Sequence, residues 1–184
     1  LRFQYLSGRK NSLSSVNGND YSGVLVVGDV TLNTTTKMLK LLSDSLKYEW
    51  FEPCERILFK PHPDCPPVGK VIAALDLGDS FEVTNLPIEK LLPQVRVAFC
   101  SSATSVSVEV SWVGKPAIIF KDAEHFIMCP LAGIAKENAV ESPEDLARVF
   151  RNPKPLNVTE EDICVDKDLI KWSEFLKQSK AKFE

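Results

Sequence analysis

The chain contains a short polar motif, KPHP at residues 60–63, whose residue types could bind a phosphate group. Its first residue, Lys60, is the last residue of the predicted strand 56–60, RILFK. The prolines on both sides keep His62 out of a helix interior and hold it in extended backbone. A histidine fixed at the end of a strand can donate a hydrogen bond to a phosphate oxygen. We therefore count His62 and Lys60 as candidate binding residues; the alternative is a histidine in an ordinary surface turn.

A second motif, SSATS at residues 101–105, stands where a predicted strand leads into a predicted helix. The hydroxyl groups of Ser101, Ser102 and Thr104, together with the free backbone N–H groups of a helix start, could bind a phosphate. The alternative is an ordinary N-cap, in which Ser102 or Thr104 accepts a hydrogen bond from the first amides of the helix. Both interpretations can hold together.

The remaining candidate residues lie near these two motifs in the predicted fold. Glu109 follows Ser102 by two helical turns, between Val108 and Val110, and its carboxylate could accept hydrogen bonds from both hydroxyls of a ribose. The alternative for Glu109 is a half-exposed helix face. Asp29 and Thr31 could help to frame the site, or only cap a helix. His125 could contact a base or sugar, although a single histidine in a loop commonly does neither.

Alternating strands and helices are expected to position these residues. Compact apolar runs predict strands at residues 23–28, 56–60, 81–84, 95–100, 116–120 and 139–140. Helical spacing and capping residues predict helices from about residue 35, at 88–92 with Pro87 in the first turn, from 101–102 through 113, and from Ser142 to about 150. Gly114 should end the third of these helices. Residues 68–77 are expected to be irregular with some helix.

This alternation predicts an α/β fold, a Rossmann-like open parallel sheet flanked by helices. In such sheets ligands bind outside the carboxyl ends of the strands. The polar loops that follow the predicted strands contain the candidate residues, and both histidines of the chain are among them. The sequence therefore predicts one ligand-binding edge, formed by residues 29–33, His62, Ser101 with Ser102, and residues 122–125.

The chain divides into three parts by composition. Residues 1–20 are rich in Ser, Asn and Gly and read as a lead-in or linker. Residues 21–151 form the expected α/β domain. Residues 152–184 form a connection and a C-terminal amphipathic helix at 166–182, with apolar residues on one stripe and lysines at its flanks.

Composition excludes several classes of function. The 184 residues carry 22 Lys and Arg against 25 Asp and Glu, a net charge of −3, so no broad nucleic-acid-binding surface is expected. No apolar run reaches the roughly 18 residues of a membrane span, and no secretory signal is visible. The five cysteines form no C-x-x-C pair. We expect reduced thiols in the cytoplasm, and neither a metal nor a cofactor.

The order of the motifs resembles a known family. KPHP after one strand, SS at the next strand-to-helix turn and then E-x-x-x-x-G-x-P from Glu109 to Pro116 are similar to the C-terminal, donor-binding half of GT-B glycosyltransferases. The similarity covers roughly residues 21–150. It is strongest to bacterial surface-carbohydrate enzymes such as sialyltransferases, whose HP and SS motifs bind the phosphate of a CMP-sugar donor. The resemblance implies that His62, Ser101 and Ser102 bind this phosphate, and that Glu109 binds the ribose.

The resemblance also implies a reaction. An acceptor hydroxyl of a carbohydrate would displace the nucleotide in surface polysaccharide or lipopolysaccharide synthesis, and His62 with the serine turn would stabilise the charge that grows on the leaving phosphate. The catalytic base of the family belongs to an N-terminal domain, so this chain alone is expected to lack it. The resemblance places the full-length protein in the cytoplasm, with peripheral association at the inner face of the membrane.

Other functions fit the same motifs. CDP-glycerol-type transferases share a similar arrangement of histidine and serine, and GT-B-like sugar-nucleotide epimerases have a related fold. A non-catalytic α/β nucleotide-binding module would keep the fold without the chemistry. The preferred nucleotide would separate the enzymes from one another, and a second α/β domain upstream of Leu1 would separate an enzyme from a module.

Overall fold

A computed structural model describes residues 23–48, 56–122, 124, 129, 131, 133–159 and 162. Within these residues the fold is built on a six-stranded sheet in the order β3-β2-β1-β4-β5-β6, and every neighbouring pair is parallel. The strands are β1 Gly23–Val27, β2 Arg56–Lys60, β3 Phe81–Val83, β4 Val97–Ser101, β5 Ala117–Phe120 and β6 Ala139–Val140. The open parallel α/β sheet predicted from the sequence is confirmed.

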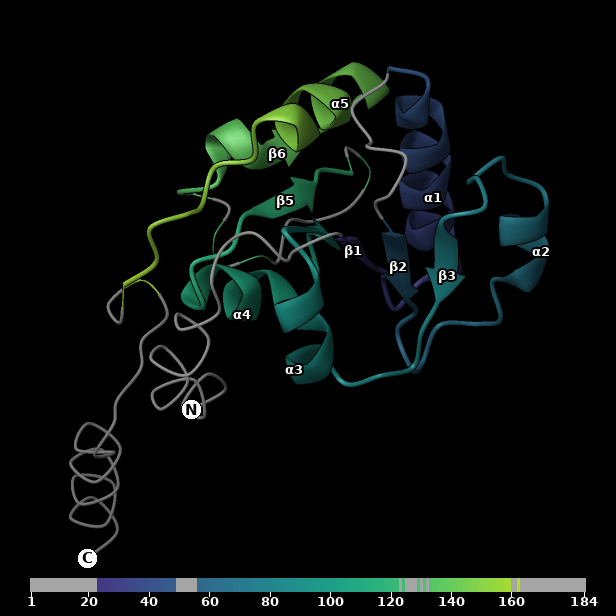
Figure 1. Ribbon diagram of the computed structural model, residues 1–184, viewed down its shortest axis with the longest axis horizontal. Coiled ribbons are helices and arrows are strands. Elements are labelled where there is room, and N and C mark those ends of the chain that lie inside the picture. Colours follow the sequence, from purple (N-terminus) through teal and green to yellow (C-terminus); the bar gives the residue numbers. More distant parts are fainter. Residues whose placement is uncertain are drawn as a thin grey trace, which may run out of the picture.

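Helices cover both faces of the sheet (Figure 1). The α-helices are α1 Leu32–Leu46, α2 Gly69–Ala73, α3 Ile88–Leu91, α4 Val106–Trp112 and α5 Pro143–Arg151, and Leu92–Gln94 and Lys136–Asn138 form 3-10 turns. Val24 and Val26 of β1 belong to the core cluster that contains the buried residues of α1 and α5. Leu25 and Val27 belong to the cluster that contains those of α3 and α4. Because side chains of a strand alternate between faces, burial on both faces explains the continuous apolar run.

Several element boundaries match the predictions. β2 and β6 have the predicted bounds, and α5 begins as expected, with Ser142 as N-cap accepting a hydrogen bond from the Asp145 amide at 3.2 Å and Pro143 in the first turn. Gly114 follows the end of α4 with a φ of +79°, in the left-handed region that favours glycine at a helix end. None of the helices described here has the length and apolar character needed to cross a bilayer.

Two predicted helix starts were wrong. α1 begins at Leu32 rather than near Thr35, because the Thr31 hydroxyl accepts a hydrogen bond from the Thr34 amide at 3.2 Å and so caps the helix earlier. α4 begins at Val106 rather than directly after Ser101 and Ser102, because residues 102–105 form a turn. Pro87 stands at the N-cap of α3, one residue before its predicted place. The predicted lead-in at 1–20 and the helix at 166–182 lie outside the described residues.

The backbone at Gly114 yields a stability prediction. A Cβ added there would meet no atom within 4 Å, so only the left-handed backbone, at φ +79°, opposes a side chain. We expect Gly114→Ala to lower the free energy of unfolding by about 1–2 kcal/mol, measured by urea denaturation. Gly69→Ala is the matched control, since its Cβ also meets open space but its φ is not positive. The free energy of unfolding of Gly69→Ala should rise by about 0.4–1 kcal/mol. Equal changes in the two variants would contradict the explanation from backbone conformation.

Lys115 predicts a pH dependence of stability. Its side chain is buried where the chain enters β5, its ammonium donates a hydrogen bond to the Val95 carbonyl, and burial lowers its pKa from 10.5 to about 8. Between these pH values the unfolded chain binds a proton that the folded chain has released. The unfolding free energy should therefore rise with pH across this window, by at most about 1.4 kcal/mol per pH unit.

Lys115→Met removes this titration while keeping a long apolar side chain. The difference in unfolding free energy between the parent and Lys115→Met should therefore grow in the parent's favour from about pH 8 to 10. Urea denaturation at several pH values measures it. A difference that is constant over this range would show that Lys115 stays charged in the folded chain.

Candidate functional site

The candidate site lies at the topological switch point of the sheet, where the connections from two neighbouring strands go to opposite faces. β1 and β4 are neighbours, with Val27 paired to Cys100, but β1 leads to α1 on one face and β4 leads to α4 on the other. The loops after these two strands therefore leave the carboxyl edge of the sheet toward opposite faces, the kind of position where parallel α/β sheets bind ligands. Residues 28–31 form one side of this point and residues 102–105 form the other. β2 lies beside β1, so the loop after β2, which contains His62, starts at the same edge of the sheet next to the loop after β1.

The serine turn, residues 101–105, contains hydroxyl groups with and without a hydrogen-bond partner. The Ser101 hydroxyl accepts from the Ala103 amide, and the Thr104 hydroxyl accepts from the Val106 amide, each at 3.3 Å. Thr104, rather than Ser102, thus satisfies a first-turn amide of α4. The Ser102 hydroxyl has no hydrogen-bond partner among the described residues. No described side-chain oxygen is both buried and unpartnered, so this hydroxyl reaches the surface although Ser102 is only 3% exposed.

The loop after β1 is held by its own polar groups. The Asp29 carboxylate accepts from the Thr31 amide at 2.9 Å, and the Asp29 amide donates to the Thr35 hydroxyl, also at 2.9 Å. The Thr35 hydroxyl in turn donates to the Asp29 carbonyl at 3.1 Å. Asp29 and Thr31 thus fix the start of α1, as the capping interpretation expects, and lie in the loop after β1. Sequence reasoning missed Thr35; its place in a run of three threonines gave no signal for this role.

His62 lies at the end of β2 with a side chain that is 35% exposed. Its Nδ1 accepts a hydrogen bond from the Asp64 amide at 3.2 Å. This bond assigns the proton of the neutral ring to Nε2 and leaves that N–H as a donor. The loop also contacts the β1 side of the site: the Gly28 amide donates to the Lys60 carbonyl at 3.0 Å, and the Cys65 sulfur lies 3.8 Å from the Thr35 hydroxyl.

Glu109 lies nearer the start of its helix than predicted. Because α4 begins at Val106, Glu109 is in the first turn of the helix rather than two turns in. It is half-buried, and its carboxylate makes no hydrogen bond or ion pair with the part of the chain that the structure describes. Lys60 is also half-buried and has no such partner there. Both side chains are thus available to a ligand at this edge.

The rest of the E-x-x-x-x-G-x-P motif lies at the opposite edge of the sheet. Lys115 donates to the carbonyl of Val95, and the Pro116 carbonyl accepts from the Ala98 amide at 3.0 Å, where β4 and β5 begin. Gly114 and Pro116 therefore serve the turn into β5. Only Glu109 of this motif is near the candidate site.

An ion-pair cluster lies after β5. The buried Asp122 carboxylate accepts from the Lys37 ammonium at 3.1 and 3.2 Å, and Lys37 also contacts Glu124 at 2.5 Å. Hydrogen bonds with Glu124 first and Asp122 second raise the pKa of Lys37. Lys37 therefore offsets the charge of the Asp122 carboxylate at this edge. The predicted site residue His125 lies outside the described residues.

Comparison with known proteins supports the fold. No protein-family model and no curated protein match the sequence. Among solved structures, a UDP-GlcNAc 2-epimerase from Neisseria meningitidis bound to UDP-GlcNAc aligns with 77% of this chain and 38% of its own length, at 15% identity and a TM-score of 0.52. A co-structure of S. aureus MnaA with UDP aligns with 78% of this chain and 44% of its own, at 9% identity and a TM-score of 0.53.

A third match is the spinosyn rhamnosyltransferase SpnG complexed with spinosyn aglycone, which aligns with 80% of this chain and 39% of its own, at 13% identity and a TM-score of 0.50. The chain thus spans 38 to 44% of the length of these three structures. At such identities the likeness concerns the fold. It confirms the Rossmann-like α/β fold predicted from the sequence.

Proposed function

We propose that this chain is the donor-binding half of a glycosyltransferase and binds a nucleotide-activated sugar at the carboxyl edge of its sheet. The observation that carries the proposal is the strand order, in which β2, β1 and β4 are neighbours. The ends of these three strands lead to His62, to the loop after β1 and to the serine turn, around the topological switch point between β1 and β4. These residues come from three separate segments of the chain. Their hydroxyl, amide and imidazole donors suit a phosphate, which needs several donors at once.

Each side chain has a distinct role in the proposal. The Ser102 hydroxyl and the Nε2–H of His62 would donate to the phosphates, and Lys60 would add positive charge. Glu109 would accept from the ribose hydroxyls. When an acceptor hydroxyl displaces the nucleotide, negative charge grows on the leaving phosphate, and donors already in place stabilise that charge without reorganisation.

The finer assignments extend this proposal. The donor would be of the CMP type, the acceptor a carbohydrate in surface polysaccharide or lipopolysaccharide synthesis, and the catalytic base would come from a domain outside this chain. The reaction would take place in the cytoplasm at the inner face of the membrane. A second candidate, a sugar-nucleotide epimerase, is favoured by the likeness in fold to the UDP-GlcNAc 2-epimerase bound to UDP-GlcNAc and to MnaA in its co-structure with UDP.

A nucleotide panel tests the proposal. CMP, CDP, UDP and GDP would be titrated into the chain and followed by ligand-observed NMR. Preference for a cytidine nucleotide supports the CMP-sugar transferase, and preference for UDP supports the epimerase or a UDP-sugar transferase. Absence of saturable binding for all four would overturn the proposal for this chain.

Ser102→Ala is the first variant to examine. Loss of one hydroxyl contact to a phosphate should weaken binding of the preferred nucleotide about tenfold, because a hydrogen bond to a charged group contributes roughly 1.5 kcal/mol or more. Calorimetric titration gives the dissociation constant. Ser80→Ala is the matched control, since Ser80 precedes β3 at the opposite edge of the sheet. Equal affinities of Ser102→Ala and Ser80→Ala would remove Ser102 from the site.

A further inference from the structure

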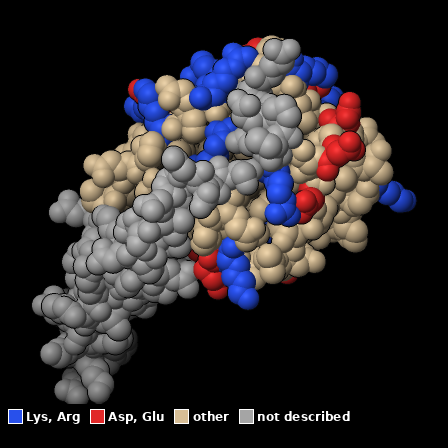
Figure 2. Space-filling model, in the orientation of Figure 1, with Lys and Arg blue, Asp and Glu red and all other residues tan. Residues whose placement is uncertain are grey.

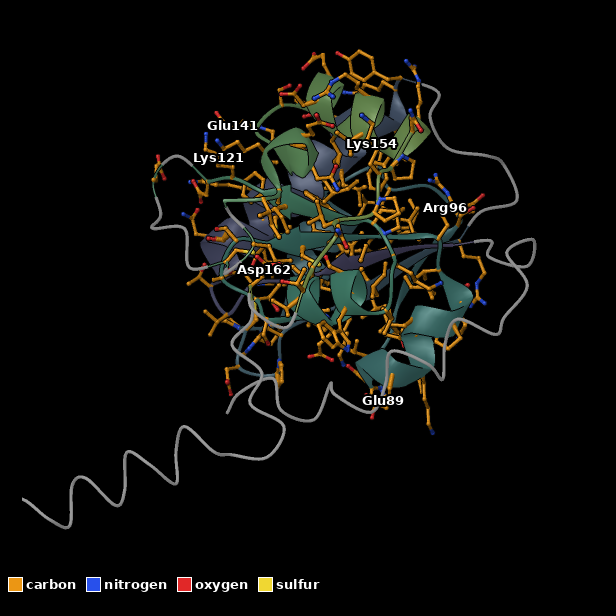
Figure 3. The ribbon with its side chains drawn as sticks, turned by 90° about the vertical axis from the view of Figure 1, so that its left-hand side faces the viewer. Glu89, Arg96, Lys121, Glu141, Lys154 and Asp162 are labelled. Atoms are coloured by element: carbon orange, nitrogen blue, oxygen red, sulfur yellow. The ribbon has the colours of Figure 1, made fainter. Side chains whose placement is uncertain are left out.

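A cleft of about 360 Å³ opens at the edge of the sheet opposite the candidate site. It lies between the C-terminal half of α5, the 3-10 turn before β6 and the segment that follows α5. Figure 2 shows Lys and Arg side chains gathered over α5, and Figure 3 labels Lys154 beside that helix. The polar residues that line the cleft are Lys136, Glu137, Asn138, Arg148, Asn152 and Lys154.

A buried amide fixes one wall of the cleft. Asn138 is 2% exposed, and its side-chain nitrogen donates to the Ala117 carbonyl of β5 at 3.0 Å and to the Lys154 carbonyl at 2.8 Å. The end of α5 is also fixed, because the Arg96 guanidinium donates to the Phe150 carbonyl at 2.9 Å. The segment that carries Lys154 is thus attached to the central sheet, and the cleft is a built feature of the fold.

Cations outnumber carboxylates in the lining. Lys154 pairs with Glu137 at 3.0 Å, and Arg148 pairs with Asp145 at 3.1 Å, but both pairs are exposed, with side chains 44 to 75% accessible. Lys136 has no ion-pair partner among the described residues. Exposed pairs are weak and screened by salt, so an anion of higher charge can compete for these cations.

We propose that this cleft is a second binding site, for a small molecule that carries a phosphate monoester. A phosphate dianion matches the excess of positive charge, a guanidinium can donate to two of its oxygens, and the Asn152 amide supplies a neutral donor. The volume lies near the lower end of the roughly 300–1,000 Å³ typical of ligand pockets. It suits a phosphate with a small organic group. The site is independent of the nucleotide site, which lies at the other edge of the sheet.

Inorganic phosphate is the probe for this site. Titration at constant ionic strength, with chloride as the compensating anion, would be followed through the side-chain amide NMR signals of Asn138 and Asn152. We expect saturable shifts of these signals in the parent chain. The double variant Lys136→Gln with Arg148→Gln should lose at least about tenfold in affinity. The double variant Lys40→Gln with Lys90→Gln has the same change in net charge away from the cleft and should bind like the parent.

His62→Ala separates this site from the proposed nucleotide site, since it should leave the phosphate response of Asn138 and Asn152 unchanged. Shifts that do not saturate would overturn the proposal, because they would show only general charge attraction. An equal loss of phosphate affinity in the two double variants would overturn it for the same reason. Loss of the response in His62→Ala would also overturn it, because the phosphate would then act from the other edge.

Discussion

We expect His62→Ala to weaken binding of the preferred nucleotide about tenfold to hundredfold, the loss of roughly 1.5 to 3 kcal/mol for a hydrogen bond to a charged phosphate. The reason is geometric. The Asp64 amide occupies Nδ1 of His62, so the remaining N–H, on Nε2, is the donor that the ring offers to a ligand. Calorimetric titration of the parent and the variant measures the ratio of dissociation constants.

His62→Gln provides the control for this prediction. A glutamine can place an N–H donor near the position of Nε2 and should recover part of the lost affinity. The unfolding free energy should change little in both variants, because the His62 side chain is 35% exposed. Equal losses in the two variants would mean that the ring contributes shape or charge instead of this hydrogen bond. Unchanged affinity in His62→Ala would remove His62 from the site.

The largest effect on stability is expected from Phe99→Ala, about 3–5 kcal/mol of unfolding free energy. Phe99 is fully buried on β4, and its ring meets Phe120 and Phe150 edge-on, with centroids 6.3 Å apart in both pairs. Its removal leaves a cavity between the sheet and α5. Urea denaturation measures the loss.

Val83→Ala is the control for the core prediction. Val83 lies on the edge strand β3 and is 53% exposed, so its truncation should change the unfolding free energy by no more than about 0.5 kcal/mol. A loss below about 1 kcal/mol for Phe99→Ala would mean that the ring does not form the centre of this core.

The strands could be predicted from the sequence because burial on both faces produces short, continuous apolar runs. β2, from Arg56 to Lys60, has the predicted bounds, and the other strands match within two residues. The helix starts were harder to predict than the strands, because each start depends on which of several similar residues caps the helix. In the run from Thr31 to Thr36 the sequence does not distinguish the cap at Thr31 from the buried Thr35, and in the serine turn it does not reveal that α4 starts only at Val106.

The site could be predicted only in part. The rule that parallel strands place their carboxyl ends at one edge brought His62 and the serine turn together. The strand order was not predictable from the sequence, because it is set by how the helices pack on the two faces. This order makes β1 and β4 neighbours at the topological switch point. The pairing of Lys37 with Asp122, 85 residues apart, follows from the same order. The roles of all the proposed site residues, His125 included, stay predictions.

The most direct test of the account is to locate the bound nucleotide. The backbone amide signals of the chain would be followed by NMR while the preferred nucleotide of the panel is added. We predict saturable shifts centred on residues 28–31, 62 and 102–105, the loops around the switch between β1 and β4. Shifts confined to other parts of the chain would contradict the account, because the ligand would then bind away from the edge on which every proposed role depends.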